Sequence, residues 1–322
     1  MRNFWTTITL ASLLALGVSQ PADAGVIAFG SGGNTFNMEF VAIGNAGNAD
    51  DTTGVPTTAG KVDYTYQMGK FEVSEDMITK FNLSQTLQIT QNNVGASKPT
   101  TLVSWNEAAR FVNWLNTSSG GFAAYNFTTT GVNDNITPWT AFEMQDFDLS
   151  NPYRSLRANY VLPSMDEWYK AAYYNPLTST YSNFATGSDT APSAVASGTA
   201  ANTAVYGGQA GPANIMSAGG LSPYGIMGMG GNVWEYEETA ELLVNSSGSS
   251  ARGFRGGFWG DNSFNLSSSS RNSINPALES NGIGFRVASL SSDAVAVPEP
   301  SSLIMFSTMA LSALWYRKRL RK

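Results

Sequence analysis

The segment GFRGGFWGDNSFNLSSSSR, residues 253–271, brings together several side chains that can take part in chemistry. Glycines flank the adjacent rings of Phe258 and Trp259, and such a backbone can turn tightly beside bulky groups, as pocket walls often do. Asp261 offers a carboxylate as a base, and Ser267–Ser270 offer hydroxyl groups. Nothing nearby activates a serine, however, and one carboxylate without a partner is weak evidence for acid–base catalysis.

A second group of carboxylates lies in GGNVWEYEE, residues 230–238. Glu235, Glu237 and Glu238 suggest the paired carboxylates of glycoside hydrolysis. We interpret Glu237 and Glu238 instead as surface charges, and from the residues alone Glu235 as a solvated or hydrogen-bonded carboxylate. In the same segment the glycines allow a sharp turn, and Trp234 is a large apolar anchor.

The composition restricts the chemistry severely, because the 322 residues include no cysteine and no histidine. Thiolate nucleophiles, disulfides, imidazole bases and sulfur- or imidazole-ligated metals are therefore excluded. Residues 25–300 contain 12 basic and 23 acidic residues, a net charge near −11. Such an acidic body argues against nucleic acid or anionic lipid as a partner.

The N-terminus, residues 1–24, is typical of a secretory signal peptide. Arg2 supplies the positive start, an apolar run follows, and Ala22–Ala24 (ADA) form a small-residue cleavage site before Gly25. An uncleaved anchor is the alternative. Export normally permits disulfides, but the chain has no cysteine, so we expect the fold to be held by packing alone.

The C-terminus, residues 297–322, follows a short linker at 291–296 and reads VPEPSSLIMFSTMALSALWYRKRLRK. The prolines precede an apolar run at 303–316, which is short for a membrane span, and five basic residues then favour a cytoplasmic end. An ordinary tail anchor is one interpretation. The combination resembles a PEP-CTERM sorting signal, which implies an exosortase as partner, passage through the inner membrane of a Gram-negative bacterium, and delivery to the cell surface or an exopolysaccharide matrix.

Residues 25–290 are predicted to form a single α+β domain with sparse regular secondary structure. Capping-box spacings, Ser104 with Glu107 and Ser164 with Glu167, predict helices over 104–116 and 164–174. A weaker helix is predicted after Ser74, and alternation over 62–73 predicts a strand. The rest reads as short strands and long ordered loops.

Several segments, taken in order, resemble the signatures of the formylglycine-generating enzyme (sulfatase-modifying factor) family over residues 34–290. They are YQMGKFEVSEDMITKFN, TLVSWNEAARFVNWLN, ANYVLPSMDEWYKAAYY, SPYGIMGMGGNVWEYEE, RGFRGGFWGD and GIGFRVAS. The resemblance implies a C-type-lectin-like α+β fold with structural calcium. It places calcium at Glu235 and the backbone carbonyls of Gly231 and Val233, with Asn202 as a second position. The family usually has a side-chain oxygen where this chain has Gly228.

Comparison with the family also shows that the chain lacks the family's two active-site cysteines. The enzyme that names the family uses copper, oxygen and two cysteines, and those positions correspond here to Asp261 and Leu266. We therefore expect no copper, since Cu(I) needs soft ligands. A branch that uses histidine-bound iron is excluded as well, because the chain has no histidine.

The sequence thus predicts an exported, non-enzymatic member of the fold that binds a ligand, possibly carbohydrate, since rings stack on sugars while carboxylates and amides bind hydroxyls. The predicted cleft consists of Phe258, Trp259, Asp261, Asn262 and Arg271. Arg286 is predicted to be a buried structural clamp. A divergent formylglycine-type oxidoreductase that acts on protein cysteine, and a purely structural matrix protein, stay open as alternatives.

Overall fold

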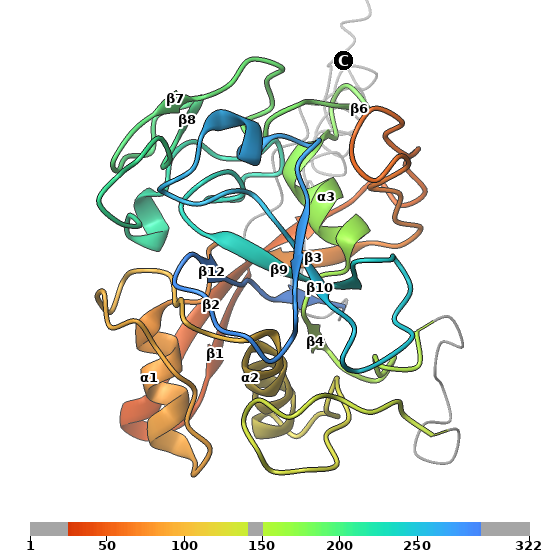
Figure 1. Cartoon of the computed structure of the whole chain (residues 1–322), viewed down its shortest axis with the longest axis vertical. Coiled ribbons are helices and arrows are strands. Elements are labelled where there is room, and N and C mark those ends of the chain that lie inside the picture. Colours follow the sequence, from red (N-terminus) through yellow and green to blue (C-terminus); the bar gives the residue numbers. More distant parts are fainter. Residues whose placement is uncertain (1–24, 141–150, 291–322) are drawn as a thin grey trace, which may run out of the picture.

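The computed structural model of the protein describes residues 25–140 and 151–290. The predicted signal peptide and sorting signal lie outside these residues. Within them, no helix is both long and apolar enough to cross a membrane. Figure 1 shows the described chain as a few short helices and curled sheets connected by long loops.

Three α-helices begin where the capping signals predict. Ser104 and Ser164 each form a complete capping box with the glutamate three residues on, and the Ser74 side chain accepts a hydrogen bond from the Met77 amide. These contacts satisfy amides that a helix start leaves without partners. The helices are α1 Glu75–Ser84, α2 Trp105–Ser118 and α3 Met165–Tyr173, with short 3₁₀ turns η1 Gly32–Asn34, η2 Ile215–Ser217 and η3 Ser263–Leu266.

Two main sheets contain most of the strands. The five-stranded sheet has the order β1-β2-β3-β13-β4, formed by β1 Gly25–Phe29, β2 Phe36–Ile43, β3 Tyr66–Gly69, β13 Ala288–Ser289 and β4 Tyr160–Val161. The four-stranded sheet has the order β11-β10-β9-β12, formed by β11 Asn272–Ile274, β10 Arg252–Arg255, β9 Trp234–Ala240 and β12 Ile283–Gly284. Two small pairs complete the set: β5 Tyr174–Asn175 with β6 Thr180–Tyr181, and β7 Ser193–Ala194 with β8 Thr203–Ala204.

The strand predicted over 62–73 is shorter than the pattern indicates. Only Tyr66–Gly69 form β3, and all four residues are buried, including the polar Gln67. The alternation therefore does not separate a core face from a solvent face, because side chains on both faces of β3 are buried, while its two edges pair with β2 and β13.

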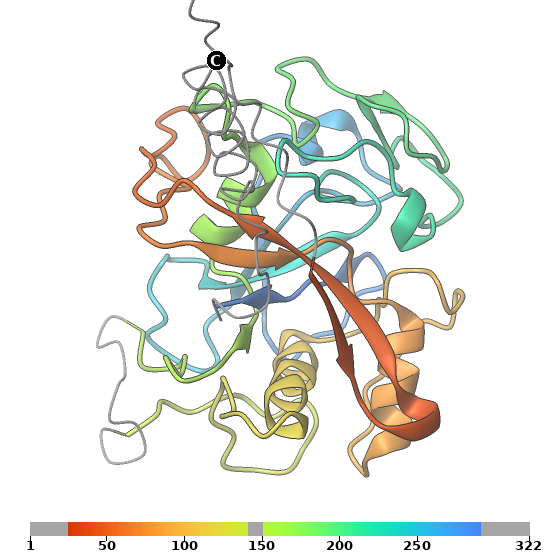
Figure 2. The same ribbon diagram turned by 180° about the vertical axis from the view of Figure 1, so that it is seen from behind.

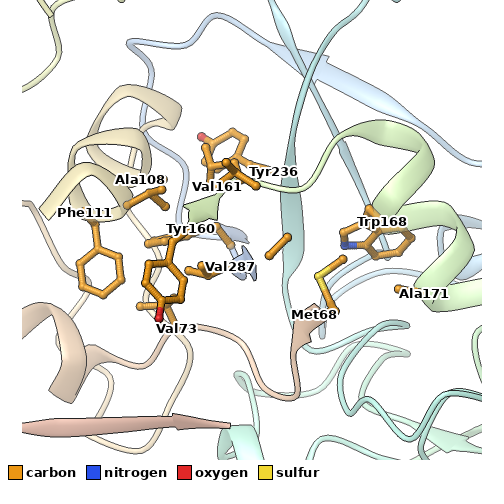
Figure 3. Close-up of a cluster of buried hydrophobic side chains, with 14 of the residues drawn as sticks. Met68, Val73, Ala108, Phe111, Tyr160, Val161, Trp168, Ala171, Tyr236 and Val287 are labelled. Carbon is orange, nitrogen blue, oxygen red and sulfur yellow. The ribbon is translucent and has the colours of Figure 1, made fainter. Parts of the chain in front are cut away.

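The core lies between the helices and the two sheets. Phe111 from α2 and Trp168 from α3 approach it from opposite sides, with Met68 of β3 and Tyr236 of β9 between them (Figure 3). The hairpin of β1 and β2 extends away from the sheet centre, and its η1 tip lies beside α1 (Figure 2). The core thus fixes β9, the strand with three carboxylates, at the centre of the domain.

Candidate functional site

Strand β9 places three carboxylates inside the protein. It follows a turn in which both Gly231 and Asn232 have positive φ, 83° and 63°. Glu235 has no exposed surface, and Arg286 holds it through two bonds, Nε to Oε2 at 2.6 Å and Nη2 to Oε1 at 2.5 Å. The indole of Trp168 donates to Oε2 at 2.7 Å. Arg286 also donates to the carbonyls of Gly69 and Met227, so the predicted clamp is confirmed.

The next carboxylate on the same face of β9, Glu237, binds two arginines. Arg255 Nε donates to its Oε1 and Arg271 Nε to its Oε2, each at 2.7 Å. Glu238, on the opposite face, accepts from the Tyr125 hydroxyl at 2.9 Å and lies 3.5 Å from Arg154 Nε.

The interpretation of Glu237 and Glu238 as surface charges is wrong. Both side chains are almost fully buried. Their burial is tolerated because arginines from other elements form ion pairs with them and a tyrosine donates a hydrogen bond to Glu238. A buried carboxylate without such partners would be strongly unfavourable. The sequence did contain a signal of buried ion pairs, because four arginines follow these glutamates in the C-terminal third and no others occur between 158 and 290. It did not indicate which arginine pairs with which glutamate.

The segment after β10 is a tight turn that holds its own polar groups. Gly256 and Gly257 have φ of 98° and 77°, conformations that favour glycine. Asp261 accepts from the Phe258 amide at 3.0 Å and from the Asn265 amide group at 2.7 Å. Asn262 caps η3 by accepting from the Phe264 amide at 3.0 Å.

Four of the predicted cleft residues lie together in this turn. The rings of Phe258 and Trp259 meet edge to face at 4.9 Å, both half-buried, beside Asp261 and exposed Asn262. A neighbouring loop pairs with them, since Gly208 and Gln209 donate their amides to the Trp259 carbonyl.

The fifth predicted residue, Arg271, is directed elsewhere. Its guanidinium binds Glu237 and the carbonyls of Thr239, Ala240 and Glu241, at the end of β9. It borders a separate hollow with Val55, Pro56 and Leu243. Arg271 therefore acts with β9 rather than with the Phe258 turn.

Leu266 ends the turn and points into the protein with only 1% of its surface exposed. Its methyl groups lie against Gly257 and Gly230, so closely that a methyl group at 257 would be 2.7 Å from Leu266 Cδ1. The Tyr173 hydroxyl of α3 donates to the Leu266 carbonyl at 3.2 Å. An apolar side chain thus anchors the turn.

Glu72 is a buried acid that the sequence analysis did not single out. Its Oε1 accepts from the Asn232 amide group at 2.8 Å, and its Oε2 has no partner among the described residues. Burial, and more weakly the negative charge of Glu235, raise the pKa of Glu72 to about 8 against the opposing effect of Arg286. The carboxyl occupies the space beside Gly228, where a methyl group would lie 2.6 Å from Oε1.

Comparison with known proteins identifies the domain. A sequence model of the sulfatase-modifying factor enzyme 1-like domain matches residues 32–290. The chain belongs to the sulfatase-modifying factor family. No curated protein matches the sequence significantly.

Solved structures support the family's C-type-lectin-like fold. Treponema denticola variable protein 1 is 18% identical with a TM-score of 0.57, over 83% of this chain and 99% of its own. CarF is 18% identical with a TM-score of 0.53, over 84% and 97%. PvdO from Pseudomonas aeruginosa is 15% identical with a TM-score of 0.51, over 84% and 99%. At these identities the likeness establishes the fold alone.

The positions that the family resemblance assigns to the two cysteines, Asp261 and Leu266, lie in different surroundings. The carboxylate of Asp261 is bonded within its own turn, and Leu266 is part of the apolar interior.

Calcium at Gly231, Val233 and Glu235 stays a prediction, and the arrangement does not favour it. Both Glu235 oxygens already bind Arg286, and a guanidinium beside a cation would be repulsive. Asn202 Oδ1 accepts from the Thr186 hydroxyl at 3.0 Å. Among residues 25–140 and 151–290, no three acidic side chains come together as a metal cluster.

Proposed function

We propose that the protein is an exported, non-catalytic member of the sulfatase-modifying factor family that binds a carbohydrate of the cell surface or matrix. The binding surface is the turn of Phe258, Trp259, Asp261 and Asn262, in the position of the family's cysteine pair. Export follows from the signal-like N-terminus and the PEP-CTERM-like C-terminus, through an exosortase.

The burial of Leu266 is the observation that carries the non-catalytic assignment. A catalytic group at this position would have to face the substrate, and the side chain present is apolar and enclosed. The whole chain has no cysteine or histidine with which to replace it.

The chemistry of the turn favours a sugar. Phe258 and Trp259 are half-buried, and Phe258 packs against the hydrophobic core, so Trp259 and Phe264, which is 65% exposed, offer the accessible ring surface of the turn. Such rings stack on the apolar faces of sugars. Asn262 is exposed and carries an amide donor that is free to bind a hydroxyl, because its oxygen alone serves the cap of η3.

A glycan array with the full-length protein tests the proposal. We expect Trp259→Ala to reduce the signal at least about tenfold, whereas Leu177→Ala, which removes a side chain that is 78% exposed outside the turn, leaves it unchanged. Signal that survives Trp259→Ala would place the site elsewhere. Absence of signal from folded protein would favour a structural matrix protein.

Mass spectrometry of a Cys-Thr-Pro-Ser-Arg peptide, incubated with the protein, copper and oxygen, tests the non-catalytic part. We expect an unchanged mass. Formylglycine in the product would overturn the assignment and favour the oxidoreductase alternative.

A further inference from the structure

We propose a second ligand site, separate from the Phe258 turn, for a primary alkylammonium group. The site is a cavity of about 710 Å³ between the start of α3, the end of β9 and the loop that follows β9. This volume lies within the range of small-molecule sites. None of the residues that line it belongs to the Phe258 turn.

Negative charge exceeds positive charge at the base of this cavity. Arg154 binds Glu167 through Nη2 to Oε1 at 2.9 Å and lies 3.5 Å from Glu238 Oε2, so one arginine faces two buried carboxylates. Asp166 and Glu238 are the two acids among the residues that line the cavity, against one arginine, Arg154. A cation is therefore the charge type that the base would stabilise.

The neutral polar groups of the cavity are largely bonded to one another. The Tyr64 hydroxyl donates to Glu167 at 2.6 Å, and the Asn151 amide donates to Glu238 at 2.5 Å. Asn245 donates to Asn151 and accepts from Arg252. These groups have little capacity left for the hydroxyls of a sugar.

Asp166 is different, because one of its oxygens is free. Oδ1 accepts from the Gly60 amide at 2.7 Å, whereas Oδ2 has no partner in the described part of the chain. A carboxylate oxygen that lacks a donor inside a cavity selects a ligand with N–H groups, and a charged N–H gives the stronger bond.

The rim explains why the ammonium group should carry a hydrocarbon chain. Leu156, Leu243 and Val244 border the opening and are 52%, 44% and 60% exposed. An alkyl chain that leaves the base would cover these side chains and remove their apolar surface from water.

Binding should depend on pH through Asp166. Burial is the main cause that raises the pKa of this carboxyl to about 6, and the charges of Asp50, Glu237 and Glu167 add to it, while the Gly60 amide opposes them. An alkylamine stays protonated throughout this range. Affinity should therefore increase from pH 5 to pH 7.5, as Asp166 ionises.

Calorimetric titration of the full-length protein with n-hexylamine, 1-hexanol and hexanoate tests the site. At pH 7.5 we expect hexylamine to bind at least about tenfold more tightly than either other compound. Asp166→Asn should lose about tenfold and also lose the pH dependence. The matched control is Asp189→Asn, which changes an exposed aspartate that likewise accepts one backbone amide.

Val244→Trp, a change at an exposed rim position, should close the opening and weaken binding without affecting the base. Equal binding of hexanol would overturn the charge argument, and tighter binding of hexanoate would assign the site to Arg154 and an anion. Unchanged hexylamine affinity in Asp166→Asn would also overturn the proposal.

Discussion

Strand β9 and the Phe258 turn both carry acidic side chains, but the two regions use them differently. Glu235 binds Arg286 and Trp168, which are 51 and 67 residues away in the sequence. Among the described residues, the side chains of Asp261 and Asn262 bind only groups within four residues of them. The carboxylates of β9 therefore connect distant parts of the chain, whereas those of the turn maintain a local shape.

This difference suggests how the family's fold can persist in a chain that has no cysteine. The buried ion pairs join β9, β10, α3 and the segment between β12 and β13, so removal of one partner leaves an uncompensated charge in the core. The turn is held by side-chain hydrogen bonds of its own, by backbone hydrogen bonds to Asn232 and to the loop at 207–209, and by one apolar anchor. Its exposed residues can therefore change without loss of the domain.

The largest expected effect is that of Arg286→Leu, which tests whether β9 holds the domain together. Loss of the guanidinium leaves Glu235 buried without its counter-charge, and we expect the free energy of unfolding to fall by about 3–5 kcal/mol. Urea unfolding followed by tryptophan fluorescence measures this. Lys61→Ala removes half of an exposed pair at 3.5 Å and should cost less than about 1 kcal/mol. Similar losses in both variants would contradict the comparison.

Leu266→Ala tests the anchor of the turn. The change leaves a void beside Gly230 and Gly257, and we expect a loss of about 2–4 kcal/mol in the same unfolding experiment. Leu278→Ala, at a side chain that is 55% exposed, is the control and should have little effect. If Leu266→Ala were as neutral as its control, the turn would not depend on an apolar anchor.

Much of the fold could be predicted, because its signals are local. The serines and glutamates of the capping boxes lie three residues apart, and the structure confirms both helices. Helical spacing within 104–116 places Ala108, Phe111, Val112 and Leu115 on one face, and all four are buried. The order of the short motifs identified the family, and membership of the family predicted the fold.

The charge network was less accessible to sequence reasoning. Glu235, Glu237 and Glu238 are neighbours in the chain, but their partners come from elements far away in the sequence. The residue type and position of a glutamate on a strand do not indicate which arginine it will bind. Arg271 was predicted to belong to the cleft, whereas it lies just before β11 and its guanidinium binds Glu237 of β9. The cavity beside Asp166 had no sequence signal, since its walls come from separate segments.

Glu72, a buried carboxyl with no arginine bonded to it among the described residues, makes the stability of the domain depend on pH. In the unfolded chain this carboxyl has its ordinary pKa of 4.5, whereas burial raises the pKa to about 8 in the folded protein. Between these values the folded state holds more protons, so the free energy of unfolding decreases as pH rises from 4.5 to 8 and then levels off. Glu72→Gln removes this contribution. From pH 5 to 8.5 we expect the wild type to lose on the order of 1–3 kcal/mol more than the variant.

Urea unfolding at the two pH values, with Glu279→Gln as the control, checks this expectation. Glu279 is exposed, so its variant should retain the pH dependence of the wild type. If Glu72→Gln retained it as well, Glu72 would be ionised in the folded protein, and a cation near Oε2 would be the simplest reason.

The smallest expected effect concerns calcium, and it tests the comparison most directly. If Arg286 supplies the positive charge beside Glu235, calcium is not needed there, and thermal unfolding in calcium and in EDTA should give melting temperatures within about 1 °C. Magnesium at the same concentration controls for ionic strength. A melting temperature that rises by several degrees with calcium alone would mean that the ion binds the folded state. Arg286 would then have to release one Glu235 oxygen, and β9 would be a metal-linked strand rather than one held by arginine alone.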